Sequence, residues 1–302
     1  MINWFFLALF GHLSNAGSFI VDKFLLKVAF KRSATYAAVI GILSLIVFLL
    51  VPWVKVWPTA ALYPYIIAFG GLFVLAVMLF FEALKRAETS RVVPIVGSLI
   101  PVFTLIGAVL FLGERLTVAE YAGFVLLFCA TWILTGGGLR ARMEPQVLLW
   151  SLGAAVLFAA SSIFGKYAFL RGDFVAVLIG SRVAVAVVGC GIALALPSSR
   201  AELMTLFHPK RGLQQSMGSW TLMILGQAAG AAGFVLVALA LAKGSAALVN
   251  ALQAVQYAAI ILVAWIGGKH VQKALGEEIT PRSLVAKSIA IVFVAAGLSL
   301  LF

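Results

Sequence analysis

Polar side chains that can form hydrogen bonds lie at helical spacing inside an apolar stretch near the carboxyl end. Asn250, Gln253 and Tyr257 occupy positions i, i+3 and i+7, so they share one helix face, with Gln256 adjacent. Amides both donate and accept hydrogen bonds, so these four residues, the amide ridge, could bind an amino acid, a nucleoside or another polar neutral or zwitterionic solute. The alternative is hydrogen bonding between helices. The chemistry indicated is recognition of a solute.

A second set of small polar side chains lies in the first apolar stretch. Ser14, Asn15 and Ser18 share one helix face with Gly11, at the spacing i, i+3, i+4 and i+7. Small residues let two helices pack closely, so this face is either a packing surface or a binding surface. Asn15 is the member that we expect to do more than pack. In the fourth apolar stretch Ser98 is a further candidate for solute binding.

Three titratable or charged residues lie at or inside apolar stretches, where such groups are costly and often functional. Arg182 needs a partner, an anionic solute or a route to the membrane interface. His12 could couple proton movement, because an imidazole titrates near neutral pH, or it could bond between helices. Glu82 could take up protons, although Lys85 and Arg86 at i+3 and i+4 also predict a salt-bridged helix end. The candidates for proton coupling are therefore His12 and Glu82.

The fourth apolar stretch contains two prolines seven residues apart, Pro94 and Pro101, which fall on nearly the same helix face. Each proline removes one backbone hydrogen bond. Carbonyl groups freed at membrane depth must line a cavity or find partners on neighbouring helices. We therefore expect a kinked or partly broken helix beside the binding site.

The composition excludes an ordinary soluble domain, because 64% of the residues are hydrophobic, 11% are charged and the mean hydropathy is +1.14. A bilayer crossing takes roughly 20 apolar residues, and continuous apolar runs indicate helices rather than the alternating strands of a barrel. The predicted fold is an all-α integral membrane protein with ten transmembrane helices. Their expected ranges are Trp4–Val21, Ala34–Val51, Tyr63–Phe81, Val92–Leu112, Ala119–Thr135, Val147–Phe164, Phe174–Leu196, Trp220–Leu241, Ala246–Ile266 and Leu284–Leu301.

The net charge of +12 is spread over the connections between apolar stretches, with no basic soluble arm, so we expect no nucleic-acid partner. One set of connections carries 16 of the lysines and arginines. Basic connections remain in the cytoplasm, so this richer side should be cytoplasmic and both termini should face outward. The opposite set carries five basic residues, which are Lys55, Arg115, Lys166, Arg171 and Lys243.

The chain contains an internal repeat marked by two similar motifs. Gly113-Glu114-Arg115-Leu116-Thr117 returns as Gly276-Glu277-Glu278-Ile279-Thr280, and each copy precedes the last apolar stretch of its half. We therefore divide the chain into two five-helix repeats, residues 1–143 and 144–302. An odd number of crossings per repeat inserts the two repeats with opposite polarity, which places a solute site near the midplane between them.

The first half contains the motifs Phe81-Glu82-Ala83-Leu84-Lys85, Ser90-Arg91-Val92-Val93-Pro94, Pro101-Val102-Phe103 and Phe111-Leu112-Gly113-Glu114-Arg115-Leu116. Together these motifs resemble the EamA-type branch of the drug/metabolite transporter superfamily. The resemblance implies a ten-helix inverted-repeat carrier that moves small solutes, often outward. Members commonly place the amino terminus inside, whereas the charge distribution here places it outside. In the second half, Val249 and Gln256 occupy the positions that match Pro94 and Pro101.

The sequence predicts a secondary transporter of small polar metabolites that works by alternating access, with export as the expected direction. No nucleotide-binding loop occurs, so we expect no ATP hydrolysis. The alternative is an exchanger or flippase for an anionic sugar phosphate or lipid-linked cargo, held by Arg182 and Lys166. The predicted substrate-binding residues are Ser14, Asn15, Ser18, Ser98, Arg182, Asn250, Gln253, Gln256 and Tyr257.

Other classes of protein fit the sequence less well. A membrane enzyme would need catalytic residues, and neither a zinc-protease motif nor a nucleophile elbow occurs in the sequence. A purely structural membrane protein would not need the amide ridge. Cys129 and Cys190 lie inside apolar stretches without metal-ligand spacing, so we expect no metal, cofactor or disulfide. The expected partners are a small-molecule substrate and the lipid bilayer of the cell membrane, and the protein should be a monomer or a homodimer.

Overall fold

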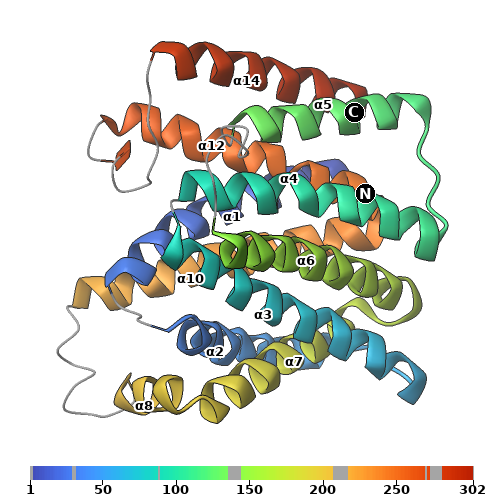
Figure 1. The fold of residues 1–302 in the computed structure, drawn as a ribbon. Coiled ribbons are helices and arrows are strands. Elements are labelled where there is room, and N and C mark those ends of the chain that lie inside the picture. Colours follow the sequence, from blue (N-terminus) through green and yellow to red (C-terminus); the bar gives the residue numbers. More distant parts are fainter. Residues whose placement is uncertain are drawn as a thin grey trace.

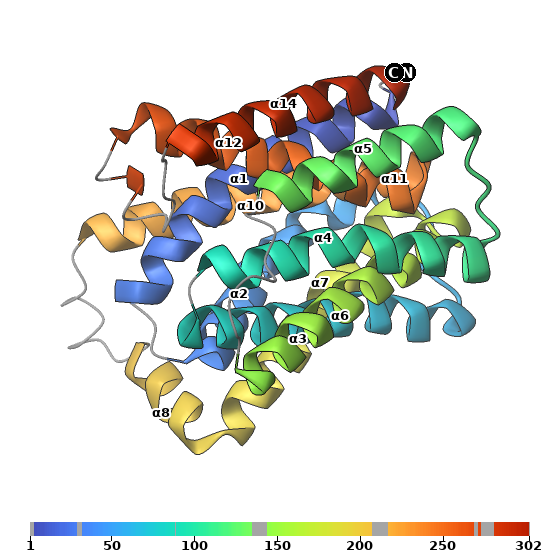
Figure 2. The ribbon, with the colours of Figure 1, turned by 45° about the horizontal axis from the view of Figure 1, so that its top comes forward.

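The computed structural model describes residues 3–28, 32–87, 89–134, 144–206, 217–268, 271–272 and 281–301, and the regular structure in this part of the chain is helical. The helices form one bundle in which the start of α1 and the end of α14 lie at the same end (Figures 1 and 2). Their bounds are α1 Trp4–Val28, α2 Ser33–Ser44, η1 Leu45–Trp53, η2 Ala60–Leu62, α3 Tyr63–Arg86, α4 Thr89–Gly107, η3 Ala108–Leu112, α5 Val118–Leu134, α6 Pro145–Arg171, α7 Phe174–Ala195, α8 Pro197–Leu206, α10 Met217–Lys243, α11 Ala246–Ala251, α12 Gln253–Ile266 and α14 Pro281–Leu301.

Eight helical stretches in the described residues are long and apolar enough to cross a membrane, and two shorter apolar helices, Val118–Leu134 and Val285–Leu301, accompany them. The prediction of an all-α fold is confirmed, whereas the number of ten crossings stays a prediction. The eight stretches are Trp4–Asp22, Ser33–Trp53, Ala60–Arg86, Ile95–Leu112, Pro145–Arg171, Phe174–Ala195, Ile224–Lys243 and Ala246–Ile266.

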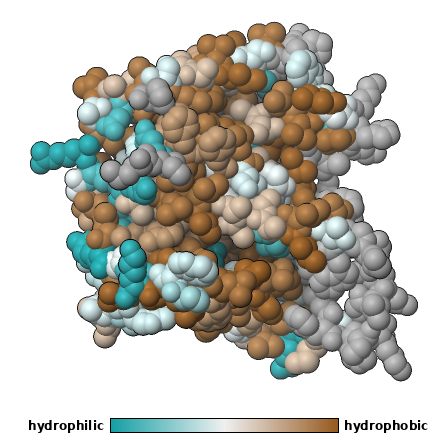
Figure 3. All heavy atoms as spheres, turned by 180° about the vertical axis from the view of Figure 1, so that it is seen from behind, coloured by the Kyte–Doolittle hydropathy of each residue, from teal (hydrophilic) through white to brown (hydrophobic). Residues whose placement is uncertain are grey.

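The surface of the bundle is apolar over most of its length. Figure 3 shows hydrophobic residues across the middle of one face and hydrophilic residues gathered toward its left side. Apolar side chains that are more than half exposed include Ile46, Leu49, Leu110, Phe111 and Ile266. A water-soluble fold would bury side chains of this size, so this surface fits contact with lipid.

Two helix ends that matter for function follow from their local sequence. The helix α11 begins after Ser245, whose Oγ accepts a hydrogen bond from the backbone nitrogen of Leu248 at 3.4 Å. The π-helical turn η3 ends at Gly113, whose φ of 67° lies in the left-handed region that glycine adopts without steric cost. This backbone requirement explains why the first copy of the repeated motif begins with glycine.

Helices of the first half pack in pairs against helices of the second half. The main pairs are α1 with α10, α3 with α6, α5 with α14, α2 with α7 and α3 with α7, and α4 packs less extensively against α11. Two further contacts are α4 with α6 and α1 with α12. If the two halves are exchanged, so that the first helix of one takes the place of the first helix of the other, these pairs map onto one another except for α3 with α7, whose counterpart, α2 with α10, packs much less extensively.

One expectation about helix shape is corrected. The fourth segment is not broken at its prolines: α4 runs as an α-helix through both Pro94 and Pro101. The ninth segment is the one that divides, because α11 ends at Ala251, α12 begins at Gln253, and Leu252 lies between them. This segment contains no proline, so the helix-breaking rule that we applied to the fourth segment gave no signal for it.

Candidate functional site

Asn250 of the amide ridge joins three helices near the divided ninth segment. Its Nδ2 donates to Thr104 Oγ1 of α4 at 2.8 Å and to Ser162 Oγ of α6 at 3.0 Å. The side chain is only 6% exposed. Because α4 belongs to the first half and α6 and α11 to the second, this amide anchors the two halves to each other.

The other ridge residues do not share one environment. Gln253 is partly buried, and its Nε2 donates to Tyr257 Oη at 3.1 Å. Tyr257 is buried against α4, where a Cβ on Gly97 would lie 2.2 Å from its hydroxyl. Gln256 is buried beside the imidazole of His12. Since the helix divides at Leu252, the ridge is not one continuous surface, and Gln253 is its most accessible member.

His12 contacts the divided segment directly. Its Nε2 lies 2.8 Å from the carbonyl oxygen of Val249, and because a carbonyl only accepts, Nε2 is the donor. At the end of α11 the Leu248 carbonyl accepts a hydrogen bond from the backbone nitrogen of Leu252, and the Val249 carbonyl accepts one from His12. Nδ1 of the same ring is buried with no hydrogen-bond partner in the described part of the chain.

The small polar residues of α1 face α10. Ser14 Oγ donates to the carbonyl oxygen of Ala229 at 2.8 Å, and a Cβ on Gly233 would lie 2.2 Å from Asn15 Oδ1. The pair α6 and α3 has a similar contact, in which Ser161 Oγ donates to the carbonyl oxygen of Phe69 at 2.7 Å. These contacts are those that close helix packing requires. A role in solute binding for this face stays a prediction.

The carboxylates of Asp22 and Glu82 accept hydrogen bonds from residues of α2. Tyr36 Oη donates to Asp22 Oδ1, Ser18 Oγ donates to Asp22 Oδ2 at 3.4 Å, and Gln227 Nε2 of α10 donates to Tyr36 Oη at 3.4 Å. The carboxylate of Glu82 accepts a hydrogen bond from Ser33 Oγ, which links α3 to α2 inside the first half.

Ser98 is fully buried in α4, in the helix face that packs into the protein interior. Its side chain is therefore not accessible to a solute in this conformation. A binding role for Ser98 would require a different arrangement of α4, and it stays a prediction.

Arg182 is the most unusual charged group in the interior. It lies within α7, and its side chain is 7% exposed. Its Cζ lies 3.5 Å from the ring centroid of Phe234 and 5.2 Å from that of Phe73. A desolvated cation–π contact contributes about 2 kcal/mol, whereas burying a charge costs several kcal/mol. The aromatic contacts alone do not offset the burial of this charge.

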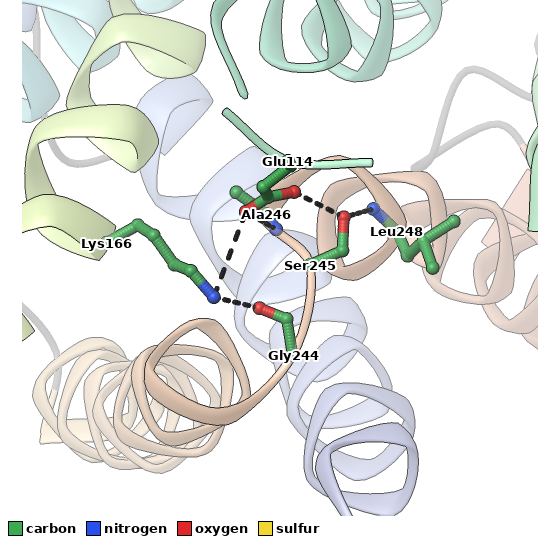
Figure 4. A network of polar contacts seen from close by, with 6 residues as sticks. All are labelled: Glu114, Lys166, Gly244, Ser245, Ala246 and Leu248. Carbon is green, nitrogen blue, oxygen red and sulfur yellow. Dashed lines mark hydrogen bonds and ion pairs between the residues drawn. The ribbon is translucent and has the colours of Figure 1, made fainter. Parts of the chain in front are cut away.

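A polar network closes the end of the bundle where α1 begins (Figure 4). Glu114 accepts from Ser245 Oγ at 2.6 Å and from the backbone nitrogen of Ala246 at 3.1 Å. Lys166 Nζ lies 3.8 Å from Glu114 Oε1 and donates to the carbonyl oxygen of Gly244. We call Glu114, Lys166, Gly244 and Ser245 the Glu114 latch, because it joins the connection after η3 to α6 and to the start of α11.

The latch gives a physical role to the motif that marked the repeat. The carboxylate at the start of α11 satisfies a free backbone N–H and interacts favourably with the positive end of the helix dipole. The sequence identified Glu114 as a repeat marker without assigning it a contact. The second copy of the motif, residues 276–280, lies outside the described residues.

Comparison with known proteins agrees with this architecture. The family model named EamA-like transporter family matches residues 2–136. Among 29 solved chains that match the structure, one crystal structure of a protein with 20% sequence identity aligns over 98% of this chain and 96% of its own, with a TM-score of 0.67. At this identity the likeness shows the fold alone. No curated protein matches the sequence.

Residues 2–136 therefore match the EamA-like transporter family, a branch of the drug/metabolite transporter superfamily, as the motifs of the first half predicted. The protein is a multi-pass membrane protein and a membrane transporter of this type. The family model ends at residue 136, shortly before residue 143, where the first repeat is predicted to end.

Proposed function

We propose that the protein is a secondary transporter of small polar metabolites that works by alternating access between two inverted repeats, residues 1–143 and 144–302. The observation that carries this proposal is the pairing of helices across the halves, most of which maps onto itself when the halves are exchanged. Such pairing is what two inverted repeats around a central solute site produce. The cell membrane is the proposed location and export the proposed direction.

The residues that we propose to line the solute site, Gln253, Asn250 and Arg182, come from α12, α11 and α7. Hydrogen-bonding groups there come from the amide ridge, and positive charge comes from Arg182. An amino-acid-like solute supplies both kinds of partner, since it carries polar groups and a carboxylate. His12 of α1 bonds to the Val249 carbonyl of α11, next to Asn250, so a movement of α11 on solute binding would also affect α1 in the other half.

The Glu114 latch supports alternating access at one end of the bundle. The latch joins α11, α6 and the connection after η3, which come from both halves. These contacts must separate for a solute to enter or leave at this end. The same end carries the smaller number of basic residues, so the charge distribution predicts that it faces outward.

Anionic cargo is a second candidate, because the Arg182 guanidinium is buried without a carboxylate partner among the described residues. The form of this alternative in which Lys166 also binds the cargo is less well supported, since Lys166 is engaged by Glu114 and by the Gly244 carbonyl. Counterflow in liposomes that contain the purified protein separates the two candidates. We expect exchange of a radioactive neutral amino acid and not of a sugar phosphate.

The two candidates for proton coupling have different hydrogen-bond partners. His12 bonds across the halves beside the amide ridge, whereas Glu82 bonds to Ser33 within the first half. We therefore expect His12→Gln to abolish accumulation driven by a pH gradient while exchange without a gradient continues, because a glutamine amide can still donate to the Val249 carbonyl.

The matched variant for this test is Glu82→Gln, which we expect to lower thermal stability and to keep gradient-driven uptake. Uptake of labelled solute is measured in liposomes with and without an imposed pH gradient. If both variants accumulate solute as well as the parent does, neither residue couples protons. Asp22, which accepts hydrogen bonds from Tyr36 and Ser18, is then the remaining acid to test.

A further inference from the structure

One edge of the Arg182 guanidinium has no partner. Its Nε and Nη2 atoms are both buried, and neither has a hydrogen-bond partner in the part of the chain that the structure describes. These two nitrogens lie on the same edge of the planar group, so their N–H bonds point in nearly the same direction. Such an edge matches the two oxygens of a carboxylate in a bidentate pair.

Aromatic rings restrict how a ligand can approach this guanidinium. Phe234 lies under one face, with its ring centroid 3.5 Å from Arg182 Cζ, and Phe73 lies at 5.2 Å. These rings come from α10 and α3, so residues of both halves surround the group. A ligand that binds the free edge must therefore lie close to the plane of the guanidinium, which a flat carboxylate does.

The charge of the site and its depth in the membrane determine which kind of anion it can bind. Arg182 lies roughly 12 Å along α7 from its start, which is beyond the reach of lipid headgroups in a bilayer core about 30 Å thick. The other candidate cation for an anionic solute, Lys166, is paired with Glu114 at 3.8 Å. The site thus offers a single positive charge, which balances a carboxylate and leaves a phosphate ester with excess negative charge in the interior.

We propose that Arg182 binds the carboxylate of the transported solute through Nε and Nη2, so that the protein takes small zwitterionic or monoanionic carboxylates. This inference rests on the proposed transport function and names its substrate class. In that arrangement the solute supplies the missing partner of Arg182. The empty protein keeps the guanidinium in place through Phe234 and Phe73.

Thermal unfolding of the purified protein tests the inference without requiring transport. The probes are the twenty common amino acids, each compared with its carboxamide, together with glycerol 3-phosphate. We expect one or more amino acids to raise the unfolding temperature and their carboxamides to have no effect. Arg182→Gln should weaken this binding about 100-fold, because two charge-assisted hydrogen bonds are lost. Arg182→Lys should also weaken this binding, because lysine keeps the positive charge but lacks the two parallel N–H donors of the guanidinium.

The matched control is Arg171→Gln. Arg171 also lies over an aromatic ring, with its Cζ 3.7 Å from the centroid of Tyr167, but it is exposed at the end of α6. This variant should bind like the parent. If Arg182→Gln does not fold, the comparison of acid with carboxamide on the parent protein and the Arg182→Lys variant decide the question.

Three results would overturn the inference. They are equal stabilisation by an amino acid and its carboxamide, stabilisation by glycerol 3-phosphate alone, and a folded Arg182→Gln protein that still prefers the acid. Transport measured in liposomes shows whether the carboxylate site alone is wrong or the proposed transport function is wrong as well. If liposomes show transport but acid and carboxamide bind alike, the carboxylate site is wrong and the transporter stands. If Arg182-dependent binding occurs without any transport, the carboxylate site stands and the proposed transport function is wrong.

Discussion

Locking the Glu114 latch should stop transport completely and reversibly. Glu114→Cys and Ser245→Cys, in a protein whose Cys129 and Cys190 are replaced by alanine, place two thiols at positions whose native side chains meet at 2.6 Å. A short bifunctional thiol reagent that is cleaved by reduction should join them. Because the latch must separate for this end to open, we expect transport to fall to the level of empty liposomes and to return on reduction.

The control for this experiment is a cross-link that stays inside one helix. Asp173 caps α7 by accepting from the backbone nitrogen of Ala176 at 3.0 Å, so cysteines at these two positions can be joined without tying the halves together. Transport should survive this treatment. Undiminished transport by the protein that is cross-linked between positions 114 and 245 would show that this end does not open during the cycle.

Removing the accessible amide of the ridge should reduce transport at least tenfold. Gln253→Leu removes a partly buried hydrogen-bonding group whose described contact is to Tyr257 on its own helix. A lost hydrogen bond to a desolvated solute costs roughly 1–3 kcal/mol, which corresponds to about a tenfold change or more. The unfolding temperature should change little. Transport in liposomes and thermal unfolding of the same preparation are the two measurements.

Asn250→Leu is expected to differ from Gln253→Leu. Its amide donates to Thr104 and Ser162, so its loss leaves two hydroxyls of the interior without this partner and should lower stability as well as transport. Ser151→Ala is the control, because Ser151 bonds to the Val147 carbonyl one turn away in α6. If Gln253→Leu transports at the parental rate, the ridge belongs to helix packing.

The helical fold could be predicted from the sequence because lipid leaves few alternatives to helices. Backbone groups need internal partners in a bilayer, and each continuous apolar run of this chain is helical in the described residues. The division of the ninth segment at Leu252 could not be predicted, since no proline or glycine marks it. The continuity of α4 through Pro94 and Pro101 shows the reverse case, in which helix breakers are present and the helix continues.

The site was predicted in part. Residue types pointed to Arg182 and Asn250 because charged and amide groups are rare in apolar helices. Their partners could not be predicted, because they come from distant parts of the chain: His12 meets Val249, and Asn250 meets Thr104. Such contacts depend on how helices of the two halves pair, which helical periodicity within one segment does not reveal.

Solute counterflow in liposomes that contain the purified protein tests the central proposal most directly. Liposomes are loaded with millimolar unlabelled amino acid, diluted, and given a trace of the same compound in radioactive form. A secondary transporter that alternates between two open states should accumulate the label transiently above its equilibrium level, and the locked Glu114→Cys/Ser245→Cys protein should not. If none of the amino acids or sugar phosphates tested produces an overshoot beyond that of protein-free liposomes, the proposal of a metabolite transporter is wrong.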